Sequence, residues 1–330
     1  MDELLKAASS GKSHTLAVAC AQDPEVLRAV WTARKAGMAE AVLVGDEARI
    51  RALAETSQLS LDDFSIVHEP DETLACRKAV SLIRKGKADA LMKGAVPTAV
   101  VMRAALDRSE GLRRGSLLSH VAFLDLPRLG RPLLLTDAAL NIAPGLEEKK
   151  KILANAVRVA HGLGNPSPVV ACLCAVEKLN PKMPATVDAA ALTEAWRQGK
   201  ITGCQVFGPA ALDNALFPAA ARRKGMEGPL AGCADILLVP NIEAGNMLYK
   251  ALAFVARAGA AGVVAGAQAP VILASRADSR ETLMHSIALA LVSMEANTTG
   301  ECKDEKGAGI EFWFHLHQAR ALCGGQADSA

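Results

Sequence analysis

Ser275 and Arg276 are neighbouring side chains whose types suit the binding of an anion. They follow a short apolar run at residues 271–273. An arginine guanidinium can hold a phosphate or carboxylate through two parallel hydrogen bonds, and a serine hydroxyl can donate to the same group. Asp278 and Ser279 come next in the chain. Either one can serve only to cap the following helix, so a structural role for these two residues stays open.

Polar side chains also follow other apolar runs in the second half of the chain. Asp137 and Asn141 come after residues 133–135, and Asn246 and Tyr249 come after residues 237–239. In an open α/β sheet, ligands bind at the carboxyl ends of the strands. The recurrence of this pattern favours a shared anion-binding site, although loop residues are polar in any case.

The first half of the chain adds cationic and hydroxyl side chains in a similar position. Lys93 follows an apolar run at residues 88–92. Thr98 and Arg103 lie on the next expected helix, within about two turns of one another. We therefore include all three among the predicted substrate-binding residues. The alternative for Arg103 is an ordinary solvent-exposed position, which most helical arginines occupy.

The elements that must position these residues alternate between strand and helix almost throughout. This alternation predicts βαβ units and a mostly parallel sheet, hence an α/β fold. The expected strands are 15–20, 41–44, 64–67, 88–92, 169–176, 204–207, 236–239, 262–264 and 271–274. The expected helices are 24–36, 47–55, 73–84, 98–106, 147–163, 187–198, 210–223, 247–258 and 280–294.

Two segments depart from this alternation. Apolar runs at 117–126 and 132–136 flank a turn-like Pro127–Gly130 segment and predict a hairpin or a crossing between domains. From Thr298 onward the chain becomes polar and glycine-rich. Its four potential metal ligands match no common zinc spacing, so an atypical tail is the favoured interpretation. These four residues are Cys302, His315, His317 and Cys323.

Composition excludes several classes of protein. The chain has 330 residues, of which 51% are hydrophobic, 22% charged and 3% aromatic, with a formal net charge of +2. The near balance of charge argues against nucleic-acid binding through bulk charge, and the few aromatics argue against a stacking platform. The 8 cysteines form no CxxC pair, which favours a reduced, cytoplasmic protein. No secretory signal or membrane-spanning segment is expected.

Several catalytic motifs are missing from the sequence. No GxGxxG follows the first expected strand, and neither a GxSxG nor an HExxH motif occurs. Gly11-Lys12-Ser13 looks like the end of a phosphate-binding P-loop. It precedes a strand rather than following one, and Lys6 occupies the place of the leading glycine, so we reject it.

Four longer segments resemble the phosphate acetyl/butyryltransferase family, most closely its butyryl branch. The resemblance covers roughly residues 15 to 295, and the segments are NIAPGLEEKKKILANAV, NPKMPATVDAA, ADILLVPNIEAGNMLYKAL and APVILASRADSRET. It implies conversion of acyl-CoA and phosphate into acyl phosphate and CoA, with butyryl preferred over acetyl. It implies no cofactor and no metal, with coenzyme A and phosphate as substrates. It also implies a homodimer or higher homo-oligomer.

The resemblance assigns roles to individual residues. It implies that Ser275 and Arg276 contact the phosphoryl group and that Arg103 binds substrate. Acetyl-specific members carry an aspartate, as the base for the CoA thiol, where this chain has Thr282. We therefore expect Asp278 to act as the base.

The resemblance also implies two domains with a cleft between them, as in isocitrate and isopropylmalate dehydrogenases. The expected first domain is discontinuous, at 1–119 and 281–300, the second spans 120–280, and the tail spans 301–330. Two alternatives remain at this stage. One is a non-catalytic relative that binds acyl-CoA, and the other is a decarboxylating dehydrogenase of the same fold.

Overall fold

The computed structural model divides the chain into two compact units. Residues 1–116 and 261–294 form the first unit, and residues 117–260 lie in the second. The structure describes residues 1–114, 117–226, 228–273 and 278–295. Ser275, Arg276, the predicted tail at 301–330 and the four potential metal ligands within it lie outside the described residues.

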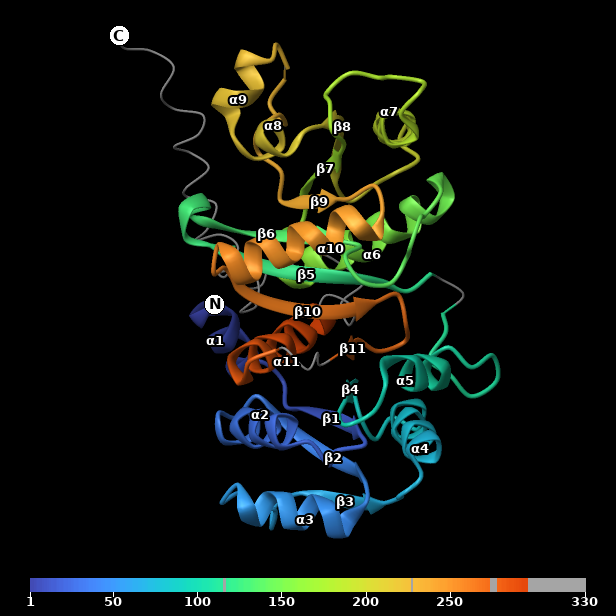
Figure 1. The fold of residues 1–330 in the computed structure, drawn as a ribbon, viewed down its shortest axis with the longest axis vertical. Helices are drawn as coiled ribbons and strands as arrows, with labels where there is room; N and C mark the ends of the chain where they lie inside the picture. The colour runs from blue at the N-terminus through green and yellow to red at the C-terminus, as the bar shows by residue number, and fades with distance from the viewer. Residues whose placement is uncertain (115–116, 227, 274–277, 296–330) are drawn as a thin grey trace. The chain divides into compact units, whose positions relative to one another are not determined.

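The first unit is a mostly parallel sheet with helices (Figure 1). Its strands lie in the order β3-β2-β1-β4-β11-β10, and only β10 runs antiparallel to its neighbour β11. The strands are β1 (His14–Ala19), β2 (Ala39–Gly45), β3 (Ser65–His68), β4 (Ala90–Lys93), β10 (Gly259–Ala265) and β11 (Val271–Ile272). The helices are α1 (Asp2–Ser10), α2 (Pro24–Lys35), α3 (Glu47–Thr56), α4 (Glu72–Arg84), α5 (Thr98–Ala105) and α11 (Arg280–Glu295).

The second unit has a sheet in the order β5-β6-β9-β7-β8. β5 runs antiparallel to β6, and the other neighbouring strands are parallel. The strands are β5 (Ser119–Leu126), β6 (Arg131–Thr136), β7 (Val169–Leu173), β8 (Gln205–Ala210) and β9 (Ile236–Leu238). The helices are α6 (Leu146–Gly162), α7 (Pro184–Arg197), α8 (Leu212–Leu216), α9 (Pro218–Arg223) and α10 (Ile242–Lys250), with a short 3₁₀-helix η1 (Pro127–Leu129) and a short π-helix η2 (Ala251–Val255).

The α/β prediction and the mostly parallel sheet are confirmed, and so is the hairpin, which β5 and β6 form. The compact units do not coincide with the predicted domains at two places. Residues 117–119 were expected in the first domain and lie in the second unit, whereas the described residues of 261–280 were expected in the second domain and lie in the first unit. The reason is strand pairing: Val271 and Ile272 of β11 pair in parallel with Leu91 and Met92 of β4.

Helix boundaries follow local capping chemistry. Asp23 was expected to begin α2, and its carboxylate accepts hydrogen bonds from the N–H groups of Glu25 and Val26 at 3.0 Å each. The helix expected at 247–258 begins earlier, because the Asn241 side chain caps α10 by accepting from the Ala244 N–H. The single helix expected at 210–223 is instead α8 and α9, interrupted at Phe217, whose backbone is extended before Pro218.

Candidate functional site

A pocket of about 450 Å³ lies in the first unit, where β4 ends and where α2, α4 and α11 begin. This volume is within the range of small-molecule sites. The pocket contains two of the predicted site residues, Lys93 and Asp278, which are far apart in the sequence. Its described lining is Asp23, Glu25, Val26, Glu72, Lys93, Gly94, Ala95, Val96, Pro97, Asp278 and Leu283.

Lys93 places a cation in this pocket. It is the last residue of β4 and is 8% exposed. Its ammonium group donates hydrogen bonds to the carbonyl oxygens of Gly94 at 3.1 Å and Val96 at 3.3 Å. These contacts hold the ammonium at the end of the strand, where it can attract an anionic ligand.

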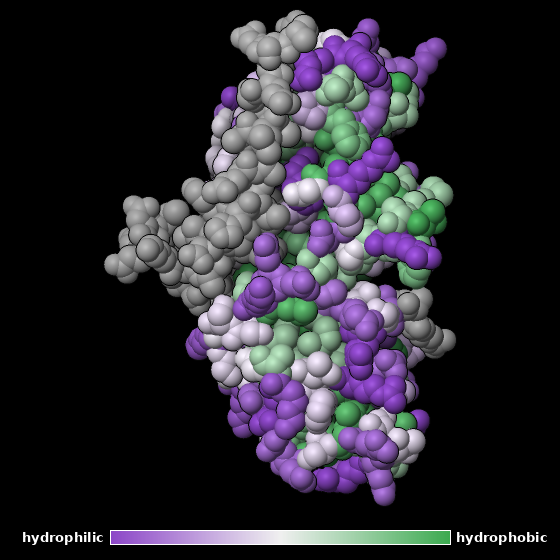
Figure 2. All heavy atoms as spheres, turned by 90° about the vertical axis from the view of Figure 1, so that its left-hand side faces the viewer, coloured by the Kyte–Doolittle hydropathy of each residue, from purple (hydrophilic) through white to green (hydrophobic). Residues whose placement is uncertain are grey.

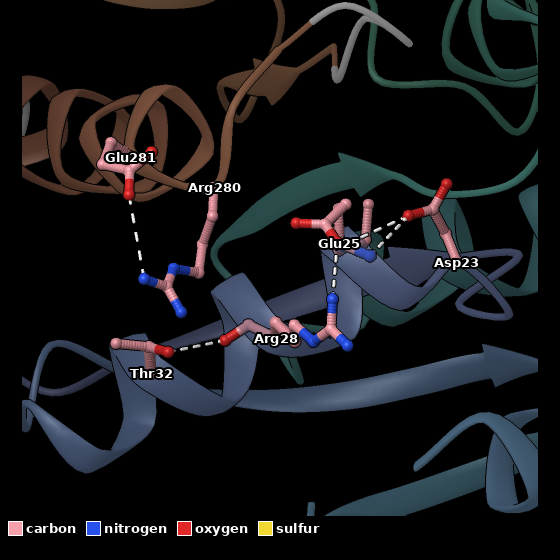
Figure 3. Close-up of polar contacts among 7 residues, drawn as sticks. Asp23, Glu25, Arg28, Thr32, Arg280 and Glu281 are labelled. Carbon is pink, nitrogen blue, oxygen red and sulfur yellow. Dashed lines mark hydrogen bonds and ion pairs between the residues drawn. The ribbon is translucent and has the colours of Figure 1, made fainter. Parts of the chain in front are cut away.

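Carboxylates of the pocket are already engaged at the start of α2, as Figure 3 shows. Asp23 caps that helix, and Glu25 forms an ion pair with Arg28 at 2.7 Å. Within α11, Arg280 and Glu281 approach to 3.7 Å, and both side chains are exposed (Figure 3). The carboxylates of α2 therefore serve mainly to build the helix start.

Two carboxylates that follow Arg276 in the sequence, Asp278 and Glu281, differ in their surroundings at the beginning of α11. The Ser279 hydroxyl accepts a hydrogen bond from the Thr282 N–H at 3.2 Å, so Ser279 caps the helix, as one alternative anticipated. Hydrogen bonds from the Glu281 backbone N–H and from Ser279 lower the pKa of Glu281, which makes it a weaker base. Asp278 lies in the pocket, which makes it the better candidate of the two.

A close backbone contact shapes one wall of the pocket. A Cβ atom at Gly94 would lie 2.2 Å from the carbonyl oxygen of Cys20, so only glycine fits there. Cys20 itself has a left-handed backbone, with φ of 53°. Its thiol is hydrogen-bonded to Cys76, and this contact together with burial raises the pKa of Cys20, while the same hydrogen bond lowers the pKa of Cys76.

Thr98 and Arg103 lie on α5, which follows the pocket residue Pro97. Thr98 is the first residue of that helix and Arg103 is in its last turn, and both are exposed. Neither is among the described lining residues of the pocket. The structure thus brings Lys93 and Asp278 together, and it leaves Thr98 and Arg103 on the neighbouring surface.

The second unit gathers the other predicted residues at one edge of its sheet. Asp137 follows β6 and is 3% exposed, and its carboxylate accepts hydrogen bonds from the N–H groups of Ala139 and Leu140 at 2.9 and 3.1 Å. The side-chain amide of Asn141 donates to Asp137 at 2.6 Å and to the Leu118 carbonyl at 2.9 Å. These contacts fix the loop after β6.

Helix α10 packs closely against the same loop. The Asn246 side-chain amide donates to the Ala138 carbonyl at 3.1 Å. A Cβ atom at Gly245 would lie 2.8 Å from the Asp137 carbonyl oxygen, so the glycine permits this approach. Asp137, Asn141, Asn246 and, one turn further along α10, Tyr249 therefore share one edge of the second unit.

His120 also lies at this edge, and the sequence analysis missed it. β5 is antiparallel to β6, and Val121 is opposite Thr136. The first residues of β5 therefore lie where β6 ends. The His120 ring contacts Tyr249 edge-on, with ring centres 6.2 Å apart. The predicted hairpin could have identified His120. In a hairpin the two strands are antiparallel, so the beginning of β5, and not its end, lies at the ligand-binding edge.

The acidic side chain that follows β8 has a structural role rather than a ligand-binding one. Asp213, which follows it, forms an ion pair with Lys224 at 3.0 Å, and this hydrogen bond lowers the pKa of Asp213.

Within the described ranges, no group of three or more histidine, cysteine, aspartate or glutamate residues could hold a metal ion. No helix in the part of the chain that the structure describes is long and apolar enough to cross a membrane.

An α/β chain with these two polar strand edges matches a family of acyltransferases. The sequence profile of the family "Phosphate acetyl/butaryl transferase" matches residues 1–74 and 69–291. The chain belongs to this family of phosphate acyltransferases, as its resemblance predicted.

Three similar proteins illustrate the range of the family. A "Probable phosphate butyryltransferase" of Bacillus subtilis is 49% identical over 90% of this chain and 99% of its own length. A "Phosphate acetyltransferase" of Thermotoga maritima is 43% identical over 88% of this chain and 98% of its own. The crystal structure of a branched-chain phosphotransacylase from Enterococcus faecalis has a TM-score of 0.76 and 35% identity, covering 86% of this chain and 99% of that one.

Proposed function

We propose that this enzyme moves a short acyl group between CoA and inorganic phosphate, with butyryl preferred over acetyl. The observation that carries the proposal is the meeting of Lys93 and Asp278 in one pocket of about 450 Å³. A cation and a carboxylate that line one pocket suit a reaction that binds an anion and moves a proton. The closer match of the sequence motifs to the butyryl branch supports the chain-length preference.

The roles in the reaction follow from the family resemblance and from side-chain chemistry. Ser275 and Arg276 hold the phosphoryl group, and the arginine stabilises charge on it in the transition state. Asp278 accepts the proton of the CoA thiol when acyl phosphate is the acyl donor. Substrate contacts come from Lys93, Thr98, Arg103, Asp137, Asn141, Asn246 and Tyr249. No covalent enzyme intermediate is needed if both substrates are bound together.

We further propose that the active site is a cleft to which both units contribute, as the resemblance implies. Support comes from the distribution of predicted residues, since Arg103 belongs to the first unit and Asn246 to the second. Substitution of each by alanine should then raise the KM for the same substrate. An effect of only one of the two would contradict a shared site.

The enzyme assay follows CoA release from acyl-CoA with a thiol reagent, with and without phosphate. We expect phosphate-dependent release. We also expect kcat/KM to rise about fourfold for each methylene from acetyl-CoA to butyryl-CoA, because a buried methylene contributes about 0.8 kcal/mol. The same rate after dialysis against a chelator would agree with a reaction that needs no metal.

Each alternative has its own outcome in this assay. A series in which acetyl-CoA is the best substrate would remove the butyryl preference and leave the reaction class intact. Binding of acyl-CoA without phosphate-dependent release would favour a non-catalytic relative. Reduction of a nicotinamide dinucleotide by a hydroxy acid would favour the dehydrogenase.

We also propose that the enzyme is a homo-oligomer that buries the surface around α10 and η2. Three large apolar side chains there are solvent-exposed: Met247 at 66%, Phe254 at 54% and Val255 at 83%. Figure 2 shows apolar areas between polar side chains on the surface. Light scattering should give a dimer or larger, and Val255→Glu should shift the mass towards a monomer. A monomeric wild-type protein would contradict this proposal.

A further inference from the structure

His120 occupies the edge of the second unit where the parallel strands end. Thr136, the last residue of β6, lies next to Leu238 at the end of β9 and opposite Val121 of β5. The Thr136 hydroxyl donates a 2.8 Å hydrogen bond to the carbonyl oxygen of His120. The backbone of His120 is therefore tied to the end of β6, at the edge where α/β sheets bind ligands.

The polar side chains around His120 are largely used to build the loop after β6. Asp137 accepts from three backbone N–H groups and from the Asn141 amide. The amide of Asn141 also donates to the Leu118 carbonyl, and that of Asn246 donates to the Ala138 carbonyl. These contacts position the edge, and each of the three side chains uses part of its hydrogen-bonding capacity in making them.

The imidazole of His120 differs from them. Its Nδ1 atom is buried and has no hydrogen-bond partner in the structure. A buried polar atom without a partner is costly, and a native protein that keeps one commonly uses it for function. A ligand that reaches this edge would supply the missing partner.

The surroundings of the ring decide its protonation state. Burial lowers the pKa of His120, and the nearby Asp137 carboxylate opposes this effect without cancelling it. Tyr249 of α10 faces the ring edge-on. On α6, Asn155 donates to the Ser119 hydroxyl, and Arg158 donates to Asn155. The imidazole is thus neutral near pH 7, with one ring N–H as a donor.

We propose that His120 donates a ring N–H hydrogen bond to the carbonyl oxygen of the acyl group during transfer. This inference rests on the proposed function. When phosphate attacks the thioester, its oxygen bonds to the carbonyl carbon and the π electrons move to the carbonyl oxygen. They return as the C–S bond breaks, and the proton of hydrogenphosphate ends on the CoA sulfur. His120 neither gains nor loses a proton.

A neutral imidazole suits this role because its donor persists through every step. The carbonyl oxygen becomes more negative in the transition state, so the hydrogen bond strengthens there and lowers the barrier. A charged imidazolium at the same place would carry the desolvation cost of a buried ion.

The test compares wild-type enzyme with His120→Leu, His120→Asn and His120→Gln in the phosphate-dependent assay. The leucine variant removes the donor, and we expect kcat to fall about a hundredfold with little change in KM. The asparagine amide reaches the place of Nδ1 and the glutamine amide that of Nε2, so at least one of them should retain clearly more activity than leucine. S-butyl-CoA, which has no carbonyl, should inhibit the wild type and His120→Leu equally.

A matched control is His161→Leu, a histidine of the same unit at the end of α6. Its Nε2 atom contacts the Gly203 carbonyl at 2.7 Å, so its loss should affect stability rather than kcat. Far-ultraviolet circular dichroism separates unfolded variants from inactive ones.

Two results would overturn the inference while leaving the proposed function intact. One is a folded His120→Leu enzyme whose kcat stays within about threefold of the wild type. The other is a folded set in which asparagine, glutamine and leucine are equally impaired. A wild-type enzyme without phosphate-dependent turnover would overturn both proposals.

Discussion

Asn141 donates a 2.6 Å hydrogen bond from its side-chain amide to the Oδ2 atom of Asp137, four residues earlier in the chain. Asp137 is nearly inaccessible and also accepts from the backbone N–H groups of Ala139, Leu140 and Asn141. One carboxylate therefore organises the turn at the beginning of the loop between β6 and α6. Any role of these residues in substrate binding depends on this turn being formed first.

Asp137→Ala should destabilise the protein by about 3 kcal/mol, because it leaves several donors without their acceptor. Asn141→Ala should cost less, since Asp137 then keeps its backbone partners. Urea unfolding of both variants and of the double variant measures the two costs and their coupling. A cost below about 0.5 kcal/mol for Asp137→Ala would mean that water replaces the carboxylate without penalty.

Arg276→Lys should lower kcat/KM about a hundredfold, since an ammonium group cannot reproduce the two-pronged contact of a guanidinium with phosphate. Arg276→Ala should be at least as impaired, with little change in thermal stability. Steady-state kinetics with phosphate as the varied substrate and a thermal melt of each variant provide the check. If the lysine variant keeps near-normal kinetics and the alanine variant melts earlier, Arg276 is structural.

Asp278→Asn tests the proposed base in the pocket of the first unit. Without a base, CoA must ionise unaided before it attacks the acyl phosphate, so activity should fall strongly at neutral pH and partly recover as the pH rises. The measurement is the rate of acyl-CoA formation between pH 6 and 9. Glu281→Gln is the matched control, because Glu281 is exposed and its lowered pKa makes it a poor base. An unchanged pH profile for Asp278→Asn would remove Asp278 from the mechanism.

Cys204 should make stability depend on pH in the alkaline range. Burial raises its pKa from 9.0 to about 11. Between these values the unfolded chain loses the thiol proton while the folded chain keeps it, so the free energy of unfolding falls as the pH rises. The free energy of unfolding of the wild type, relative to that of Cys204→Ala, should therefore fall as the pH rises across this range.

Urea unfolding at pH 8 and at several values up to 11 measures this difference. Ser167→Ala is the control, since it removes an exposed polar group that does not titrate there. A difference between the wild type and Cys204→Ala that is constant across the range would show that the Cys204 thiol ionises equally easily in both states.

Local signals in the sequence predicted most of the elements. The alternation of apolar runs and capping residues placed β1, α2 and β2 within a few residues, because each boundary rests on short-range chemistry such as the Asp23 cap. The short helix α1 at Asp2–Ser10 was missed, since it follows no strand and lies outside the alternating pattern. The break before Pro218 was missed because the sequence there is otherwise rich in good helix formers.

The site was harder to predict because it depends on contacts between distant segments. Lys93 and Asp278 were each identified from their place after a strand, and the structure brings them into one pocket. His120 was invisible to the same rule, since it begins a strand, and only antiparallel pairing with β6 brings it to the edge. The sequence also did not show that Asp137 and Asn141 bind one another, because a polar loop residue looks the same whether its partner is a ligand or the backbone.

The return of the chain at residues 261–294 has a consequence for synthesis on the ribosome. β4 is paired with β1 on one side and with β11 on the other. Residues 117–260, which lie in the second unit, leave the ribosome before β11 does, so they are synthesised while β4 still lacks its partner on that side. An unpaired edge strand is prone to foreign pairing. Between the emergence of Lys93 and that of Val271, one edge of β4 is therefore open to pairing with a foreign strand.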